Sequence, residues 1–408
     1  MALLPPPQLA DQMPVRNADQ RRFKRSANSD QPLARHNGDA CPALNLLTIS
    51  NVSKGPTMAK FIDLTVTAIE PTTADAVVVS LMPTDGSVLS FVQGQYLTFK
   101  HMIDGAEVRR SYSICSPVGG QAVQVGIKRV DGGAFSNWAN AELKIGDTLQ
   151  ALSPMGHFHT PLSPEQSRAY VGFAIGSGIT PLLSIIRTTL ETESRSTFSL
   201  VYANRSIQTI MFKEELEDLK NKYMNRLNVV HILKTGQEDI ELFSGRLDRP
   251  KLQDLFTKWL HVPNFDTAFI CGPQEAMTTI ANTLQEFGMD QNNIKYELFG
   301  TPNAHPNPAA QTQVKTTDVA LKVVIDGVSS DLSGGSDMSV LDAALAAGIE
   351  APYACKAGVC STCRCKVTDG HVEMRVNHAL EDYEVAAGYV LSCQAYPKTA
   401  SVSVEYDE

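Results

Sequence analysis

Four cysteines near one end of the chain have the spacing that most restricts how this part can fold. Cys355, Cys360 and Cys363 follow one another as C-x4-C-x2-C, and Cys393 comes after 29 further residues. This is the ligand spacing of a plant-type [2Fe–2S] cluster, whose thiolates converge on two irons. We therefore expect three ligands on one tight loop and the fourth on a distant strand.

The loop between the first two cysteines contains Ala357 and Gly358. Residues this small let the backbone wrap around a cluster and turn N–H groups toward its sulfurs, which is one control on its potential. Structural zinc is the main alternative, although its sites usually combine a C-x2-C pair with a second pair or with histidines. The x4 spacing and the isolated Cys393 favour iron and sulfur over zinc.

Length and composition describe an ordinary globular protein. The 408 residues have room for two to four domains, and 43% are hydrophobic while 19% are charged. Without a run of ~18 apolar residues or a signal-like N-terminus, we expect no membrane span and a cytoplasmic location with reduced thiols. The net charge is −9, and residues 319–408 alone hold six basic and thirteen acidic residues. This excess argues against nucleic-acid binding and suits either solubility or docking to a basic protein surface.

The pattern along the chain divides it into five parts. Residues 1–57 contain a Pro5–Pro7 run and no sustained apolar period, so we predict a disordered extension, with Met58 as an alternative start of translation. The domains that follow are predicted as a β-barrel at 58–162, an α/β domain at 163–300, a proline-containing linker at 301–318 and the cysteine-bearing domain at 319–408.

Hydrophobic periodicity sets the fold class of each part. Short alternating runs broken by turn residues predict an antiparallel barrel before residue 160. Predicted strands over 169–175, 198–203, 227–233, 268–271 and 294–298 then alternate with helices, which predicts a doubly wound parallel sheet. In the last domain, Ser339 and Asp342 form the start signal of a helix over 340–347, and Gly348 is its stop signal.

Arg110-Ser-Tyr-Ser113 lies on the predicted fourth strand of the barrel. Arg110 and Tyr112 are two residues apart and so share a face of that strand. The guanidinium can bind a pyrophosphate with two hydrogen bonds, the tyrosine offers a flat surface to a ring system, and Ser113 adds a hydroxyl and a backbone N–H. A solvated surface arginine is the alternative interpretation.

Asp131-Gly-Gly-Ala-Phe-Ser136 leads into a predicted helix. A glycine-rich turn at a helix N-terminus presents unpaired N–H groups that favour phosphate. An ordinary hairpin turn is the alternative, but together with Arg110 the pattern around Gly133 and Ser136 favours a phosphate site.

Gly176-Ser-Gly178-Ile-Thr-Pro181 follows the first strand of the α/β domain. A strand-to-helix turn with two glycines is where a dinucleotide pyrophosphate approaches the backbone. Thr180 is expected to cap the following helix and Pro181 to occupy its first position.

Two further residues lie at predicted strand ends of the same domain. Cys271-Gly272-Pro273 ends the fourth strand, at the edge of the sheet where ligands bind, or is only a buried thiol before a turn. Arg205 follows the second strand, where this fold selects the ribose 2′ substituent, and an arginine there favours NADPH over NADH. A solvated loop arginine is the alternative.

The order and spacing of these motifs resemble the ferredoxin–NADP reductase superfamily, and with the C-terminal cysteine domain the chain is similar to reductase components of multicomponent bacterial oxygenases. The resemblance implies a β-grasp ferredoxin fold for 319–408, with Cys355, Cys360, Cys363 and Cys393 as cluster ligands. It implies FAD binding by Arg110, Tyr112, Ser113, Gly133 and Ser136. It implies nicotinamide nucleotide binding by Gly176, Gly178, Thr180, Arg205, Cys271 and Gly272.

The resemblance also implies the chemistry. Ser113 would lie near the flavin N5 and Cys271 near the nicotinamide carbon that gives up hydride, while Glu297 and Phe299 match a segment beside the flavin. Electrons would pass from NADPH or NADH through FAD and the cluster to the subunits of a di-iron oxygenase acting on an aromatic ring. A reductase for a different aromatic-ring or steroid hydroxylase, and a redox carrier or sensor without turnover, are the alternatives.

Overall fold

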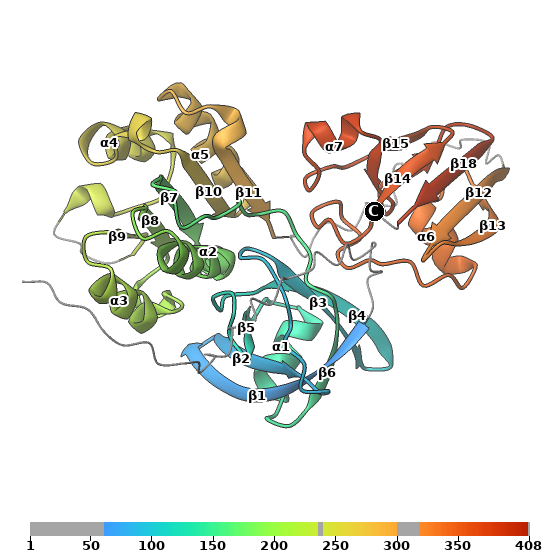
Figure 1. Ribbon diagram of the computed structural model, residues 1–408, viewed down its shortest axis with the longest axis horizontal. Helices are drawn as coiled ribbons and strands as arrows, with labels where there is room; N and C mark the ends of the chain where they lie inside the picture. Colours follow the sequence, from blue (N-terminus) through green and yellow to red (C-terminus); the bar gives the residue numbers. More distant parts are fainter. Residues whose placement is uncertain (1–60, 236–239, 300–317, 407–408) are drawn as a thin grey trace, which may run out of the picture. The chain divides into compact units, whose positions relative to one another are not determined.

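The computed structural model describes residues 61–235, 240–299 and 318–406 (Figure 1). The predictions for residues 1–57 and for almost all of the 301–318 linker therefore lie outside the described residues. No helix in the described ranges is both long and apolar enough to cross a membrane.

The first domain is a six-stranded antiparallel barrel with one helix, α1 (Ala134–Ala141). Its strand order is β4-β3-β6-β1-β2-β5, and a bridge between Ile114 and Val125 joins the two ends of the sheet. Apolar side chains that alternate along the strands, such as Leu97 and Phe99, fill its interior. The strands are β1 (Phe61–Thr73), β2 (Ala76–Pro83), β3 (Tyr96–Ile103), β4 (Ala106–Ser113), β5 (Val123–Lys128) and β6 (Thr148–Leu152).

The second domain is a five-stranded parallel sheet in the order β11-β10-β7-β8-β9. Its strands are β7 (Ala169–Ile175), β8 (Thr197–Asn204), β9 (Leu227–Leu233), β10 (Thr267–Gly272) and β11 (Ile294–Leu298). Its helices are α2 (Ile179–Thr192), α3 (Lys213–Lys222), α4 (Arg249–Lys258) and α5 (Gln274–Glu286). Its 3-10 turns are η1 (Gly176–Gly178), η2 (Ile207–Thr209), η3 (Glu241–Phe243), η4 (Val262–Asn264) and η5 (Gln291–Asn293). The order reverses between β7 and β10, which is where ligands bind in such sheets.

The third domain has a five-stranded mixed sheet, β13-β12-β18-β14-β16, and a two-stranded sheet, β15-β17. Its strands are β12 (Asp318–Ile325), β13 (Val328–Gly335), β14 (Arg364–Asp369), β15 (Val372–Met374), β16 (Tyr389–Leu391), β17 (Ala395–Pro397) and β18 (Ser401–Glu405). Its helices are α6 (Val340–Ala346) and α7 (Asp382–Ala386). Ser339 caps α6 by accepting from the Asp342 N–H at 3.1 Å, as its sequence predicts. The predicted fold class, an antiparallel barrel, a parallel α/β domain and a ferredoxin-like domain, is confirmed.

Candidate functional site

The four predicted ligands, which are four of the five cysteines of the C-terminal domain, lie in two pairs of thiols. Cys360 donates to Cys355 with the sulfurs 3.1 Å apart, and Cys363 is hydrogen-bonded to Cys393. Cys363 directly precedes β14, and Cys393 follows β16, which pairs with β14. The sheet thus brings the distant fourth cysteine to the loop that carries the other three.

The conformation of the cysteine loop depends on its small residues. Gly358 has a φ of +74°, and a Cβ there would lie 2.7 Å from the Val376 carbonyl oxygen, so a larger residue does not fit. The loop is held by the His378 N–H, which donates to the Gly358 carbonyl at 2.9 Å, and by the Gln394 amide, which donates to the Lys356 carbonyl at 3.0 Å. These contacts fix the backbone around the sulfurs.

The electrostatics of the loop favour thiolates at two of the four positions. The Cys360 thiol lowers the pKa of Cys355 to about 6 against the effect of burial, and the Ala357 N–H donates to the Cys355 sulfur at 3.3 Å. The hydrogen bond from Cys363 likewise lowers the pKa of Cys393. In the described ranges, no three metal-binding side chains meet around one ion position. Two thiol pairs suit two irons better than one tetrahedral zinc.

The barrel strand β4 carries Arg110 and Tyr112 as predicted. Tyr112 packs against Phe135 of α1, with the ring centroids 5.5 Å apart, and remains half-buried. Arg110 is exposed, donates to the Arg109 carbonyl at 2.7 Å and forms no ion pair with any described residue. A fixed aromatic ring beside an available guanidinium fits a flavin and its pyrophosphate.

The glycine turn before α1 also has the predicted form. Gly133 is the N-cap residue of the helix, and a Cβ there would lie 2.7 Å from the Ser136 hydroxyl oxygen. That hydroxyl is buried and accepts from the Val130 N–H at 3.2 Å. Ser136 therefore shapes the turn, and the phosphate site at this helix N-terminus stays a prediction.

The turn after β7 uses its two glycines for different reasons. Gly176 has a φ of +57°, whereas a Cβ at Gly178 would lie 2.2 Å from the Cys271 carbonyl oxygen. The prediction that Thr180 caps α2 is wrong. The η1 turn makes the helix begin at Ile179 with Gly178 as its N-cap, and the Thr180 hydroxyl donates backward to the Ser177 carbonyl at 3.0 Å. Pro181 is thus the third helical residue, where its missing N–H costs nothing.

Two other residues of the predicted nucleotide site, and Phe299, which is predicted beside the flavin, lie at the same edge of the parallel sheet. Arg205 directly follows β8, is exposed and forms no ion pair in the described part of the chain. Gly272 ends β10, and a Cβ there would lie 2.8 Å from the Ile175 side chain. Phe299 is half-buried against the core shared by the barrel and the α/β domain.

A hydrogen-bonded pair joins the barrel to the parallel sheet. The Ser113 hydroxyl donates to the Glu297 carboxylate at 2.9 Å, and Cys271 is the register partner of Glu297 in the pairing of β10 with β11. Burial raises the pKa of Glu297 to about 7, although the hydrogen bond from Ser113 opposes this. The pKa of the Cys271 thiol lies well above its ordinary value, mainly because the thiol is buried and to a lesser extent because the Glu297 carboxylate is nearby. The two residues predicted to be catalytic, Ser113 and Cys271, thus meet around a carboxyl group that titrates near neutral pH.

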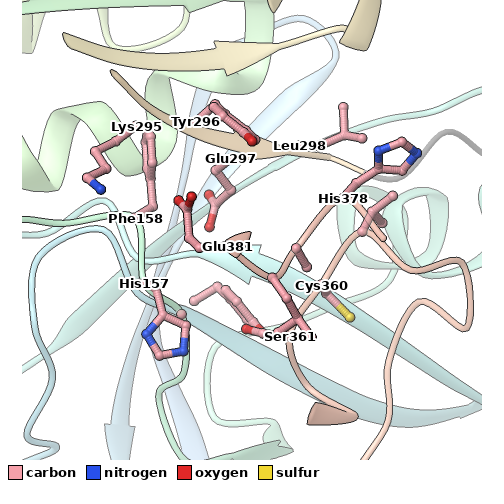
Figure 2. A pocket seen from close by; sticks show the side chains of 15 residues that line it. His157, Phe158, Lys295, Tyr296, Glu297, Leu298, Cys360, Ser361, His378 and Glu381 are labelled. Carbon is pink, nitrogen blue, oxygen red and sulfur yellow. The ribbon is translucent and has the colours of Figure 1, made fainter. Parts of the chain in front are cut away.

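A pocket lies beside this carboxyl group and reaches the cysteine loop. Figure 2 shows Phe158 from the loop after β6, Glu297 from β11, Glu381 from the start of α7 and Cys360 with Ser361 around it. Its lining mixes ionisable side chains, such as Lys295, Glu297 and Glu381, with apolar ones, so it brings the carboxyl group of Glu297 and the cysteine loop to one polar pocket. The local sequence patterns around 361 and 381 gave no sign that these residues line a shared pocket.

Three protein families match successive parts of the chain. Residues 63–160 match the oxidoreductase FAD-binding domain, 173–283 the oxidoreductase NAD-binding domain and 323–398 the 2Fe-2S iron-sulfur cluster binding domain. These matches support FAD, a nicotinamide nucleotide and a [2Fe–2S] cluster as the cofactors.

Two relatives and one solved structure extend over most of the chain. The chain is 41% identical to a component of 1,2-phenylacetyl-CoA epoxidase from Escherichia coli, over 86% of this chain and 99% of that protein. It is 34% identical to the ferredoxin reductase component of 3-ketosteroid-9-alpha-monooxygenase from Rhodococcus rhodochrous, over 86% and 98%. The structure of phthalate dioxygenase reductase covers 85% of this chain and 98% of its own, with a TM-score of 0.53 at 22% identity, and shows the same fold.

Proposed function

The chain belongs to the ferredoxin–NADP reductase superfamily, among the reductase components with a C-terminal [2Fe–2S] domain, and we propose that it supplies electrons to a di-iron oxygenase that epoxidises the ring of phenylacetyl-CoA. The reductase chemistry itself is that of an NAD(P)H-dependent oxidoreductase acting as an electron-transfer component. When bound, FAD would accept two electrons as one hydride and release them one at a time to the cluster. The protein supplies binding sites, spacing and a proton-holding group.

The residues of the two nucleotide sites divide this work. In this proposal Arg110 and the Gly133 turn bind the FAD pyrophosphate, and Tyr112 packs against the ring system. Gly176 and Gly178 let the backbone approach the pyrophosphate of the nicotinamide nucleotide. Arg205, exposed and without an ion pair among the described residues, is suited to a 2′-phosphate, which supports NADPH as the preferred donor.

The observation that carries the proposal is the group formed by Ser113, Glu297 and Cys271. The neutral Cys271 thiol offers a small uncharged surface, which suits a nicotinamide ring that must come close to the flavin. A carboxyl group with a pKa of about 7 can hold or release a proton at working pH, and its hydrogen bond to the Ser113 hydroxyl connects it to the predicted flavin edge. Hydride uptake by a flavin is accompanied by proton movement, so this pair is suited to the first half of the reaction.

The oxygenase partner is proposed from the 41% identity with the epoxidase component, which extends over nearly all of that protein. The second candidate is a steroid hydroxylase, supported by 34% identity with the 3-ketosteroid monooxygenase component. The cytoplasm is the proposed location, because the four ligand cysteines must stay reduced until they bind iron.

Reconstitution separates these candidates. The holo-protein with NADPH and oxygen should form epoxide from phenylacetyl-CoA when the di-iron oxygenase subunits are added, and none without them. If the holo-protein instead supported hydroxylation by the 3-ketosteroid oxygenase and not epoxidation of phenylacetyl-CoA, the steroid hydroxylase would be its partner. Steady NADPH-dependent reduction of cytochrome c by the reductase alone would exclude a carrier that does not turn over.

A further inference from the structure

A buried network of hydroxyl groups joins the barrel to the cysteine loop. The Tyr96 hydroxyl lies 3.2 Å from the Ser361 hydroxyl and 3.2 Å from the Thr362 hydroxyl. Thr98 lies 3.4 Å from Thr362 and 2.9 Å from Ser111. Tyr96, Thr98, Ser361 and Thr362 are each at most 6% exposed. Ser361 and Thr362 are the two residues between Cys360 and Cys363, so the network ends between two predicted cluster ligands.

The barrel holds Tyr96 in a fixed position. Its backbone exchanges two hydrogen bonds with Met155, at 2.8 and 3.1 Å. The backbone of Gly156 lies so close to the ring that a Cβ there would be 3.1 Å from it. Tyr96 is also the register partner of Ser113 in the pairing of β3 with β4, and directly paired residues of antiparallel strands share a face. Tyr96 therefore stands beside the residue predicted to lie at the flavin N5.

A second contact holds the other end of the cysteine loop. The Arg109 guanidinium lies 4.1 Å from the ring centroid of Tyr353, two residues before Cys355. Arg109 is buried, and its Nε donates to the Glu107 carboxylate at 2.8 Å, so the planar group is fixed in orientation. Contacts before Cys355 and after Cys360 restrain the loop at both ends.

We propose that Tyr96 is a positioning residue for electron transfer, because its hydroxyl holds the cluster-binding loop at Ser361 and Thr362 against the strand pair that carries Ser113. The proposal rests on electron flow from FAD to the cluster and not on the identity of the oxygenase. Each NAD(P)H gives up two electrons, and transfer to the cluster proceeds one electron at a time. Two transfers therefore cross this contact for every nucleotide oxidised. A tyrosine that only fills space would need its ring, whereas this role needs the hydroxyl.

Tyr96→Phe in the full-length holo-protein tests the proposal, because it keeps the ring against Gly156 and removes the hydroxyl. Rapid mixing with NADPH without oxygen separates reduction of the flavin from the later reduction of the cluster, each followed at its own absorbance band. We expect flavin reduction to keep its rate and cluster reduction to slow by roughly five- to tenfold, about the effect of one lost hydrogen bond. Ser361→Ala should slow the same step, and the double variant should be no slower than the slower single variant.

Two controls distinguish positioning from a general structural effect. Tyr170→Phe removes another buried tyrosine hydroxyl, which donates to Glu193 at 3.0 Å within the α/β domain, and should change neither rate. Iron content, the electron paramagnetic resonance spectrum and the midpoint potential of the cluster should be the same in Tyr96→Phe and the wild type. Unchanged cluster reduction in Tyr96→Phe and Ser361→Ala overturns the proposal. Lost iron or a shifted potential in both variants also overturns it, because the hydroxyls would then serve cluster assembly or tuning.

Discussion

Glu297→Gln should change how the protein responds to pH. The substitution keeps an oxygen that accepts from the Ser113 hydroxyl and removes a carboxyl group whose pKa burial raises from 4.5 to about 7. Below pH 4.5 this carboxyl is neutral in both the folded and the unfolded chain, so it costs nothing. As the pH rises toward 7, the unfolded chain loses the proton first, and the folded state becomes relatively less stable.

The size of the effect follows from the two pKa values. A difference between 4.5 and about 7 corresponds to about 3 kcal/mol between the protonation states. The Glu297 side chain borders the pocket and is partly accessible, so solvent screens part of this cost, and we expect about 1–2 kcal/mol. The stabilisation of the variant relative to the wild type should therefore be absent near pH 4.5, grow with pH and level off above about pH 7.

Thermal unfolding of the holo-proteins across this pH range measures the change as the difference in Tm. The rate of flavin reduction by NADPH should show a wild-type inflection near pH 7 that the variant lacks, provided that Glu297 exchanges a proton during hydride transfer. Val88→Ala, at a barrel position that is 66% exposed, serves as a control whose pH profile should follow the wild type. Parallel Tm profiles for Glu297→Gln and the wild type would refute the raised pKa, and retention of the inflection would refute the proton-holding role.

Three other substitutions test the remaining sites. Cys360→Ser should remove the cluster, seen as lost iron and lost cytochrome c reduction, while NADPH–ferricyanide activity persists; zinc without iron in the native protein would contradict this. Arg205→Ala should raise the KM for NADPH by about ten- to a hundredfold, the effect of one charged hydrogen bond, and leave that for NADH almost unchanged. Gly178→Ala places a Cβ 2.2 Å from the Cys271 carbonyl oxygen, so it should lower Tm and weaken nucleotide binding by forcing the turn away from β10. An unchanged Tm would show that the turn relaxes freely.

Most of the fold could be predicted because strands, helix starts and the cysteine loop each depend on residues that are close together in the sequence. The strand ranges 169–175, 227–233 and 294–298 are found unchanged in the structure. The central strand 169–175 reads as an almost continuous apolar run, whereas 227–233 and 294–298 are edge strands in which apolar residues are mixed with polar ones. The helix after Ser339 starts as its capping pattern indicates. The cysteine spacing likewise predicted a loop that meets a distant segment, because ligand geometry limits the possible arrangements. The expected strand at Cys393 is wrong, because this residue lies in the turn between β16 and β17. The assignment of individual FAD and nucleotide contacts stays a prediction.

Other features depend on contacts that no local pattern encodes. Thr180 has the residue type of an N-cap, but the η1 turn starts the helical path earlier and makes Gly178 the cap. The raised pKa of Glu297 requires a neighbouring domain to bury its carboxyl group. Tyr96 and Ser361 are 265 residues apart, and neither residue type alone distinguishes a contact from a solvated hydroxyl. Sequence reasoning finds such a pair only after the strands and the loop have been placed.

The register of β3 against β4 connects the two halves of the reaction. Tyr96 pairs with Ser113 and Thr98 with Ser111 on the face that meets Glu297 and the cysteine loop, while Leu97 pairs with Tyr112 on the opposite face. Side chains alternate with a period of two, so a slip by one residue would move Tyr96 off this face and bring Leu97 onto it. The hydroxyl of Ser113 and the hydroxyl of Tyr96 would then no longer be neighbours. A single strand pairing thus places the Ser113 hydroxyl, which donates to Glu297, beside the Tyr96 hydroxyl, which lies against the cysteine loop. The proposed proton-holding role of Glu297 and the proposed restraint on the loop therefore depend on the same short stretch of the barrel.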